Sequence, residues 1–192
     1  VTTPEADFHR YVGNRDSQTL YLRAANHLPL AVAREPFLRA EDGLASGYTR
    51  CGVCFVRAPD VGLDELHPFT IASSPRPDGT MTFSIRALGG WTRSLPATLR
   101  TGTRVQVEGP YGRFDFRKGG ARQIWLACGI GITPFLAWAE SLTEAERRDI
   151  HLVHCVRTQD EAIGLETLRA AAARNPRFSF EVVVTARDGR LT

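Results

Sequence analysis

Two kinds of hydrophobic pattern divide the chain. Up to about residue 116, apolar and polar positions alternate in short runs between turns rich in Pro and Gly. The alternating apolar positions are Leu20 and Leu22, then Met81, Phe83 and Ile85, then Val105 and Val107. A period of two over short runs predicts a small antiparallel β-barrel. The stretch from about Pro29 to Gly47 has no clear period, and we expect it to be loop.

The pattern changes after 116–121, which reads as a linker. Apolar runs at 123–127, 150–156 and 178–184 predict three strands, and helical patterns begin near Pro134 and span 160–174. Strands that alternate with helices predict a parallel sheet. The expected fold is therefore a β-barrel domain over 1–116, followed by a Rossmann-like α/β domain over 121–192.

Three strands are few for a complete doubly wound sheet. The chain also begins with Val1 rather than Met, and it ends at Thr192 directly after a strand-like run. We therefore expect a piece of a longer protein, with the α/β domain truncated at its C-terminus and a membrane part outside the sequence given.

Composition and charge narrow the class of protein. The chain has 43% hydrophobic and 23% charged residues, which is ordinary for a globular protein. The net charge of +3 is not gathered in a basic stripe, so nucleic acid is not an expected partner. We find no apolar run of 18 residues and no signal peptide, so no membrane span is predicted in these residues.

The cysteines are at positions 51, 54, 128 and 155. Cys51 and Cys54 form a CxxC pair, but a zinc site needs a second pair. A thioredoxin-like site needs the motif to open a helix, whereas this one leads into the strand-like Phe55-Val56. We therefore expect unpaired thiols in a reduced compartment, and no metal site.

A glycine turn, Cys128-Gly129-Ile130-Gly131-Ile132-Thr133-Pro134-Phe135, follows the first predicted parallel strand. Gly129 and Gly131 let the backbone approach a ligand closely. Thr133 is expected to cap the following helix, with Pro134 at its first position. Such a helix start suits a pyrophosphate. The turn differs from the GxGxxG fingerprint, and a plain strand-to-helix turn remains an equal alternative.

Two arginines follow the next two predicted strands. Arg157 and Arg187 stand where ligands bind in open α/β sheets, at the carboxyl ends of strands. Their forked side chains suit the 2′-phosphate of NADPH, although either arginine alone is more often a surface charge. Asp160 and Glu161 keep NADH open as the alternative, because a carboxylate can bind a ribose 2′-hydroxyl.

Four segments of the first domain suggest a second ligand. They are His67-Pro68-Phe69-Thr70, Arg86, Gly89-Gly90-Trp91-Thr92 and Gly109-Pro110-Tyr111-Gly112. Arg86 is out of phase with the alternating apolar positions before it, so it is available to an anion. Gly89 and Gly90 permit close backbone approach. Thr92 is expected to cap the short segment 93–95, which makes another N-terminal anion site.

Together with GIGITPF, these segments resemble the ferredoxin–NADP reductase superfamily, in its NADPH oxidase and ferric reductase branch. The resemblance runs from about Tyr48 to the C-terminus. It implies FAD and NADPH as cofactors. It places Phe69 against the isoalloxazine ring, Thr70 at flavin N5 and His67 beside the FAD ribose and phosphates.

The same resemblance assigns the remaining residues. Arg86 and the 89–92 segment would hold the FAD pyrophosphate, and GIGITPF the NADPH pyrophosphate. The complete FAD set is His67, Pro68, Phe69, Thr70, Arg86, Gly89, Gly90, Trp91 and Thr92. The complete NADPH set is Gly129, Gly131, Thr133, Pro134, Arg157 and Arg187.

Two departures from the family pattern stand out. Cys51-Gly52 occupies the place of a Gly-Gln pair. The family's later Cys-Gly-Pro segment and its aromatic C-terminus lie beyond Thr192. We therefore expect the chain to bind FAD well and NADPH poorly.

The resemblance implies that NADPH gives a hydride to FAD N5 across a cleft between the domains. Electrons then pass singly to a haem in a fused transmembrane domain, which reduces oxygen or ferric iron. The module itself is expected at the cytoplasmic face of that membrane. Two alternatives remain. One is a soluble reductase for a ferredoxin or an oxygenase, although soluble members usually carry an arginine-led motif in place of HPFT. The other is a flavin-binding subunit without turnover.

Overall fold

The computed structural model describes residues 19–23, 29–33, 51–76 and 81–189, and it divides the chain into two compact units. The first unit is Val1–Arg113 and the second is Phe114–Thr192. Across the described ranges, no helix has the length and the apolar character needed to cross a membrane.

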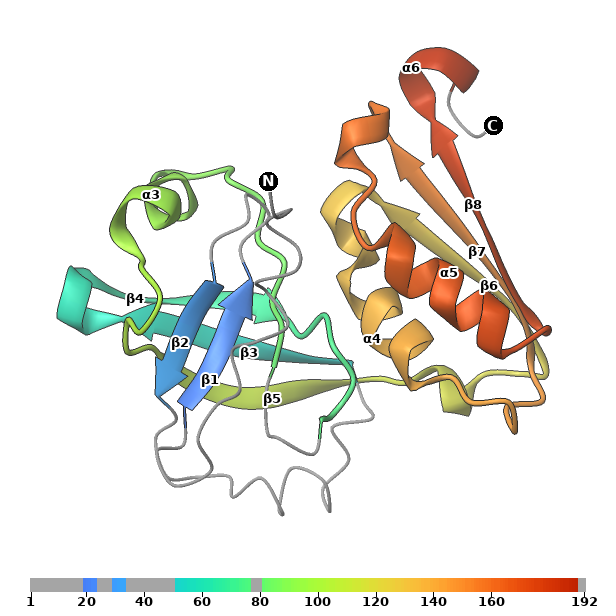
Figure 1. Cartoon of the computed structure of the whole chain (residues 1–192), viewed down its shortest axis with the longest axis horizontal. Helices are drawn as coiled ribbons and strands as arrows, with labels where there is room; N and C mark the ends of the chain where they lie inside the picture. The colour runs from blue at the N-terminus through green and yellow to red at the C-terminus, as the bar shows by residue number, and fades with distance from the viewer. Residues whose placement is uncertain (1–18, 24–28, 34–50, 77–80, 190–192) are drawn as a thin grey trace, which may run out of the picture. The chain divides into compact units, whose positions relative to one another are not determined.

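The first unit is built on antiparallel strands (Figure 1). Its elements are β1 (Thr19–Arg23), β2 (Pro29–Ala33), β3 (Cys51–Ala58), β4 (Leu63–Thr70), α3 (Gly90–Thr98) and β5 (Gln106–Phe114). β1 pairs with β2, and the order β4-β3-β5 makes a second sheet in which β3 and β4 are antiparallel. The prediction of loop over 29–47 was wrong for Pro29–Ala33, which is a strand; residues 34–47 lie outside the described part.

The alternating run at 81–86 does not form a regular strand. Met81, Phe83 and Ile85 are buried, at 4%, 0% and 4% exposure, and Phe83 makes an isolated antiparallel bridge with Ile71. The pattern therefore identified the buried side correctly. The segment packs against the core without a continuous hydrogen-bonded partner.

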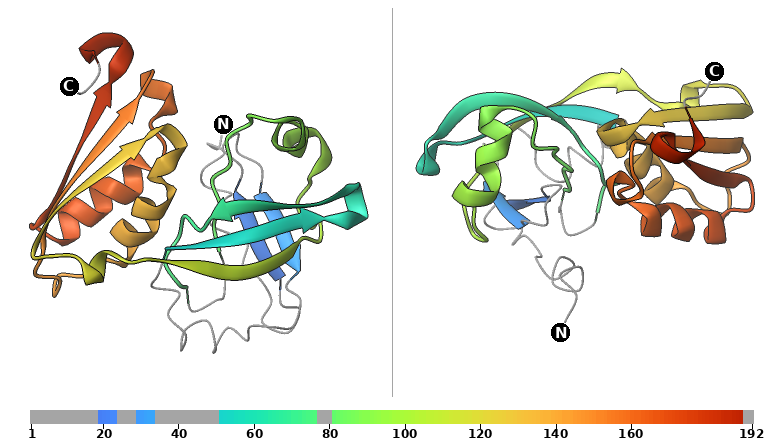
Figure 2. Two further views of the ribbon diagram at one scale, coloured as in Figure 1. Left: turned by 180° about the vertical axis from the view of Figure 1, so that it is seen from behind. Right: turned by 90° about the horizontal axis from the view of Figure 1, so that it is seen from above.

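The second unit has a three-stranded parallel sheet. Its elements are β6 (Arg122–Cys128), α4 (Thr133–Ser141), β7 (Asp149–Val156), α5 (Leu165–Arg174), β8 (Phe178–Val184) and α6 (Thr185–Asp188). The order is β6-β7-β8 with both pairs parallel, as the alternation of strands and helices predicted. α4 and α5 lie on the same face of this sheet (Figures 1 and 2).

An aromatic cluster fills the space between the sheet and α4. The Trp125 ring lies 5.6 Å from Phe135 and 5.0 Å from Trp138, measured between centroids. Phe116 is 4% exposed and lies 5.4 Å from both tryptophan rings. The prediction of a linker over 116–121 was therefore wrong at Phe116. This residue begins a short 3-10 helix, Phe116–Lys118, and belongs to the core.

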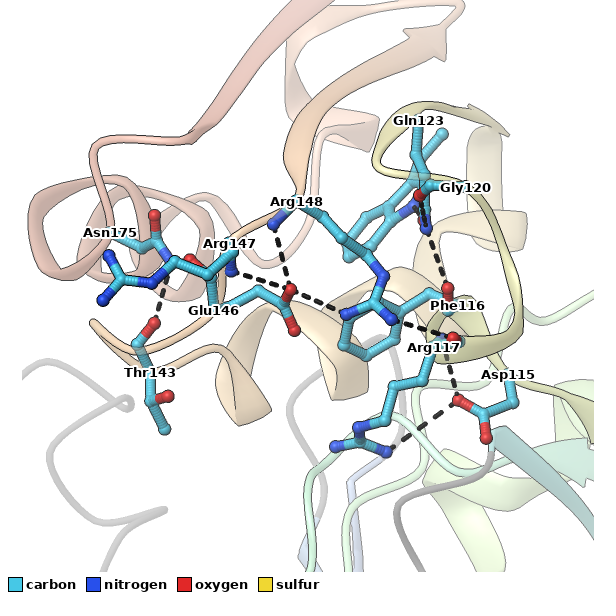
Figure 3. Close-up of polar contacts among 11 residues, drawn as sticks. Asp115, Phe116, Arg117, Gly120, Gln123, Thr143, Glu146, Arg147, Arg148 and Asn175 are labelled. Carbon is cyan, nitrogen blue, oxygen red and sulfur yellow. Dashed lines mark hydrogen bonds and ion pairs between the residues drawn. The ribbon is translucent and has the colours of Figure 1, made fainter.

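A polar network ties the chain together at the amino ends of β6 and β7 (Figure 3). The guanidinium of Arg148 donates to Glu146 Oε1 at 2.7 Å and to the Arg117 carbonyl at 2.9 Å. The Gln123 amide donates to the carbonyls of Phe116 at 2.8 Å and Gly120 at 2.9 Å. Ligands of open α/β sheets bind at the opposite, carboxyl ends, so this network is structural.

Candidate cofactor-binding sites

The HPFT segment forms the end of β4. His67 to Thr70 are its last four residues. They pair with β3, with Val56 opposite His67 and Val53 opposite Thr70. Pro68 has no N–H to give to a second neighbour, and β4 is an edge strand of the β4-β3-β5 sheet, where proline is tolerated.

The Trp91 side chain, which belongs to α3, contacts two residues of this strand. Residues two apart in a strand share a face, so His67 and Phe69 lie on one side of β4 and Thr70 on the other. The Trp91 ring lies 4.3 Å from the His67 ring and 5.8 Å from the Phe69 ring, measured between centroids. The Trp91 Nε1–H is buried and has no hydrogen-bond partner among the described residues. The sequence assigned these residues to one ligand, but it gave no sign that both rings contact the Trp91 ring.

The amino end of α3 is exposed and begins with two glycines. The helix begins at Gly90 with Gly89 as its N-cap, so the expected cap at Thr92 was wrong. Thr92 is instead in the first turn, where its Oγ1 accepts the N–H groups of Leu88 and Gly89 at 2.9 Å each. The first N–H groups of a helix have no intrahelical acceptor.

Gly89 and Gly90 keep the approach to these N–H groups open. Both glycines are exposed, and a Cβ at either would meet no atom within 4 Å. Arg86 is also exposed, in contrast to the buried Met81, Phe83 and Ile85, as its phase predicted. Exposed N–H donors at the helix start, open glycines and an arginine three residues before the N-cap fit the pyrophosphate of a dinucleotide.

The GPYG segment explains the glycine at position 52. A Cβ on Gly52 would lie 2.4 Å from Pro110 Cβ, so only glycine fits where β3 meets β5. Gly109 has a φ of 127° and lies against Val53 O and Cys54, which again requires glycine. The departure at Cys51-Gly52 thus has a packing reason at Gly52. The side chain of Cys51 lies outside the described part.

The glycine turn of the second unit starts its helix earlier than expected. Gly129–Ile132 form a 3-10 turn that continues directly into α4. Thr133 is therefore the first residue of α4 and is 5% exposed, not its cap, and Pro134 is second. Gly129 has a φ of 52°, and Gly131 is exposed, where a Cβ would meet no atom within 4 Å. The start of this helical segment is open to an anion.

His154 supports this turn from the neighbouring strand and was not predicted. Its side chain is 0% exposed, and its Nε2–H donates to the Gly129 carbonyl at 3.0 Å. Burial lowers the pKa of His154 below its usual value, although the bond to Gly129 acts in the opposite direction. The only sequence signal was a histidine on the same side of β7 as Leu152 and Val156.

Arg157 and Arg187 come from neighbouring strand ends. Val156 pairs with Val184, and the Ala186 N–H donates to the Arg157 carbonyl at 3.2 Å. Both arginines are exposed. Arg187 lies in α6, and its guanidinium donates to Asp188 at 2.7 and 2.9 Å.

The carboxylates expected to favour NADH are also at this edge. Glu161 Oε2 accepts the N–H of Arg157 at 3.1 Å, so it is part of the turn after β7. Asp160 is exposed, and its pKa is lowered by a hydrogen bond from the Thr158 side chain. Across the described residues, His, Cys, Asp and Glu nowhere form a group of three that would hold a metal ion.

Comparison with known families identifies both units. A family of FAD-binding domains matches residues 39–115, and a family of oxidoreductase NAD-binding domains matches residues 125–190. Together they cover most of the chain, in this order. The chain belongs to the ferredoxin–NADP reductase superfamily. FAD and NAD(P)H are therefore its cofactors.

The relatives include an oxygenase electron transfer component as well as an NADPH oxidase and a ferric reduction oxidase. The toluate 1,2-dioxygenase electron transfer component of Pseudomonas putida is 32% identical, over 66% of this chain and 38% of that protein. NADPH oxidase 1 of Rattus norvegicus is 34% identical, over 46% of this chain and 16% of that protein. Ferric reduction oxidase 4 of Arabidopsis thaliana is 35% identical, over 47% and 14%. The chain thus spans at most 38% of the length of these relatives.

Solved structures show the same superfamily fold. The Amycolatopsis cytochrome P450 reductase GcoB aligns with a TM-score of 0.59 and 22% identity, over 70% of this chain and 43% of that one. Ferredoxin-NADP+ reductase from Plasmodium falciparum aligns with a TM-score of 0.60 and 16% identity, over 72% and 58%. The antiparallel sheet followed by a parallel sheet with helices, predicted from the sequence, is thereby confirmed.

Proposed function

We propose that the chain is an NADPH-dependent flavin reductase module that passes electrons through FAD to a separate acceptor. One observation carries the proposal: each unit offers open glycine positions at the start of a helical segment, Gly89 and Gly90 in the first and Gly131 in the second, in the part matched to its cofactor family. These two sites fit the two pyrophosphates that such a reductase must hold.

FAD, when bound, accepts a hydride at N5 and releases electrons one at a time. The residues of the chain bind and orient it. Phe69 and Trp91 would supply aromatic surface, the α3 start and Arg86 would hold the pyrophosphate, and His67 would lie beside the ribose and phosphates. The Thr70 hydroxyl would serve the flavin N5 position. No acid or base of the protein is needed for this transfer, so positioning provides the catalysis.

In the second unit, the proposal assigns NADPH to the carboxyl edge of the parallel sheet. The turn at Gly129 and Gly131 takes the pyrophosphate, with Thr133 and Pro134 starting the helix behind it. Arg157 and Arg187 take the 2′-phosphate, which pairs with guanidinium groups through charge-assisted hydrogen bonds. This assignment favours NADPH over NADH.

For the acceptor, we propose a haem in a transmembrane domain, with the module at the cytoplasmic face of that membrane. The HPFT segment supports this choice, and so do the relatives named NADPH oxidase 1 and ferric reduction oxidase 4. The test is the full-length protein in its native membrane. NADPH should then reduce a haem whose spectrum is followed anaerobically, and a full-length protein without haem would contradict this acceptor.

The decisive experiment on the module is an anaerobic absorbance titration with FAD and then NADPH. We expect bound flavin whose visible absorbance bleaches on NADPH addition, followed by reoxidation with ferricyanide. Bound flavin that stays oxidised even at saturating NADPH would indicate a flavin-binding subunit without turnover and would contradict the reductase proposal. A folded chain that binds no flavin would contradict the assignment of His67 to Thr70.

A matched pair of variants makes the titration specific. Gly131→Glu places a carboxylate at the open turn, so it should abolish bleaching while FAD still binds. Gly120→Glu makes the same chemical change at another exposed glycine with no atom near its Cβ position, outside the turn. It should bleach like the parent chain.

A second candidate acceptor is an oxygenase system. The toluate 1,2-dioxygenase electron transfer component matches more of the chain than NADPH oxidase 1 does, 66% against 46%. This acceptor predicts that the NADPH-reduced module reduces an iron–sulfur protein rapidly in solution. Equal rates with unrelated small electron acceptors would argue against it.

A further inference from the structure

Cys128 and Cys155 face each other across β6 and β7. They are register partners in the parallel pair, Cys128↔Cys155. Their chain neighbours Ala127 and His154 are buried toward the helices, at 1% and 0% exposure, so the two cysteines point to the opposite face of the sheet. Cys128 is exposed and Cys155 is partly buried.

The pairing register places the two thiols side by side. Their side chains are within hydrogen-bonding range of each other, and both are free. Neighbouring strands lie about 4.8 Å apart. A disulfide usually joins Cα atoms about 4.4 to 6.8 Å apart. Closure of a bond between them therefore requires rotation of two side chains and little movement of the backbone.

This thiol pair adjoins the glycine turn. Cys128 immediately precedes Gly129, and Cys155 immediately follows His154, which donates to the Gly129 carbonyl. Both thiols are near the carboxyl ends of their strands, two residues or fewer from the turns that the nucleotide site uses. A disulfide here would link the residue before Gly129 to the residue after His154, and thus the two strand ends that hold the glycine turn.

We propose that Cys128 and Cys155 form a reversible disulfide when the protein meets a peroxide, and that this bond weakens nucleotide binding at the glycine turn. Its effect on the nucleotide rests on the proposed function, whereas the chemistry of the thiol pair does not. Sequence reasoning expected these cysteines to be unpaired thiols, and the register of β6 and β7 is what brings them together.

The reaction balances with hydrogen peroxide as the oxidant. The Cys128 thiolate attacks one peroxide oxygen, the O–O bond breaks, and water leaves as Cys128 becomes a sulfenic acid. The Cys155 sulfur then attacks the Cys128 sulfur and a second water leaves. Two thiols and one peroxide thus give one disulfide and two waters, and a dithiol reductant reverses the change.

Exposure decides the order of the two steps. Cys128 is the more accessible thiol, and access and thiolate content set susceptibility to oxidation. Burial, with the neighbouring Cys128, raises the pKa of the Cys155 thiol and keeps it protonated. Cys128 is therefore the attacking residue and Cys155 the resolving one.

Peptide mapping by mass spectrometry after brief peroxide treatment of the folded chain tests the chemistry. We expect a Cys128–Cys155 cross-linked peptide that dithiothreitol removes, while the buried Cys54 stays unmodified. In Cys155→Ser, a dimedone adduct should accumulate on Cys128. In Cys128→Ser, Cys155 should give no adduct. Oxidation without the 128–155 link would overturn the proposal.

NADPH affinity, measured by calorimetry on the FAD-loaded chain before and after oxidation, tests the consequence. We expect the dissociation constant to rise about three-fold or more, to recover with dithiothreitol, and to stay constant in Cys155→Ser. A disulfide that leaves the affinity unchanged would overturn the proposed link to the nucleotide. If the reduced chain binds no NADPH, the proposed function fails, while the peptide map still decides whether the disulfide forms.

Discussion

At the scale of single residues, the role of a side chain depends on the groups that it contacts as well as on its type. Arg187 was assigned from its position after a strand, and the structure adds that its guanidinium pairs with Asp188. A 2′-phosphate carries more negative charge than one carboxylate. It would therefore compete with Asp188 for the same donors, or share them.

Arg187→Ala should weaken NADPH binding about ten-fold or more while changing NADH binding little, because only NADPH carries the 2′-phosphate. A hydrogen bond to a charged group contributes about 1.5–3 kcal/mol, which corresponds to this range. Dissociation constants for both nucleotides, measured by flavin bleaching or calorimetry, provide the check.

Arg177→Ala is the matched control for this prediction. Arg177 also pairs with a carboxylate, Asp149, at 2.6 Å, but it precedes β8 at the amino edge of the sheet. The substitution Arg177→Ala removes the same positive charge and should leave the affinities for NADPH and NADH unchanged. Equal losses of NADPH and NADH in Arg187→Ala would remove Arg187 from the 2′-phosphate site.

His154 predicts a pH dependence of stability. Its pKa is lowered in the folded chain from the usual 6.5 by burial, so the unfolded chain binds the proton more readily. The stability that depends on neutral His154 is therefore fully present above about pH 6.5, and it is lost as the pH falls toward the lower pKa of His154 in the folded chain. Urea unfolding between pH 5 and 8 should show this loss.

His154→Gln isolates that contribution. Glutamine can still donate to the Gly129 carbonyl, but it does not titrate. The variant should lose less unfolding free energy than the parent chain between pH 7 and pH 5. An identical pH profile for the two proteins would show that other groups account for the acid sensitivity.

At the scale of elements, the sequence predicted helices and strands best where the spacing of the apolar residues and the length of the run indicated the same element. The three apolar runs of the second unit are β6, β7 and β8, and the helical pattern near Pro134 is α4. The alternation at 81–86 gave the correct buried face but the wrong element. Alternation reports burial of an extended chain, and it carries no information on the hydrogen-bonded neighbour.

Other predictions of elements and helix caps were wrong for local reasons. Phe116 lies between charged and glycine residues, which made the segment read as a linker. Its burial depends on Trp125 and Trp138, which belong to the next strand and the next helix. Thr133 and Thr92 both have the side chain of a helix cap. The glycines before each of them start the helical turn earlier, so both threonines fall inside the first turn.

Gly164 is expected to control how α5 starts against α4. Its φ is 73°, and a Cβ there would lie 2.3 Å from Leu136 Cδ2. Gly164→Ala should therefore lower the free energy of unfolding by about 1–3 kcal/mol, from left-handed backbone strain and overpacking. Chemical denaturation followed by far-UV circular dichroism measures the change.

Gly120→Ala supplies the comparison for that loss. Gly120 has no positive φ, and no atom lies within 4 Å of its Cβ position. Its substitution should change stability by less than about 0.5 kcal/mol, as is usual for surface sites. A similar loss in both variants would mean that the contact with Leu136 is not what makes glycine necessary at 164.

At the scale of the whole molecule, each unit buries apolar side chains of its own. Leu95 is 1% exposed in the core of the first unit, and Leu168 is 0% exposed in the second. Leu168→Ala should cost about 2–5 kcal/mol in the second unit, yet leave FAD affinity unchanged. Leu95→Ala should weaken FAD binding by a comparable destabilisation of the first unit.

Flavin fluorescence for FAD binding, combined with thermal unfolding, distinguishes these cases. Equal losses of FAD binding in both variants would show that the two units unfold as one. Sequence alone predicted two domains from the change of period, but it contained no measure of how independently each one is stable.

The contact of the Trp91 ring with His67 and Phe69 has an optical consequence. Of the three tryptophans, Trp91 is in the first unit, while Trp125 and Trp138 are neighbours in the aromatic cluster of the second. Flavin bound beside β4 would quench the emission of Trp91 by energy transfer. Ultraviolet excitation of a Trp91→Phe variant, compared with the parent chain, then separates this signal from the emission of the other two. The chain thus carries an intrinsic reporter of flavin occupancy that needs no added dye.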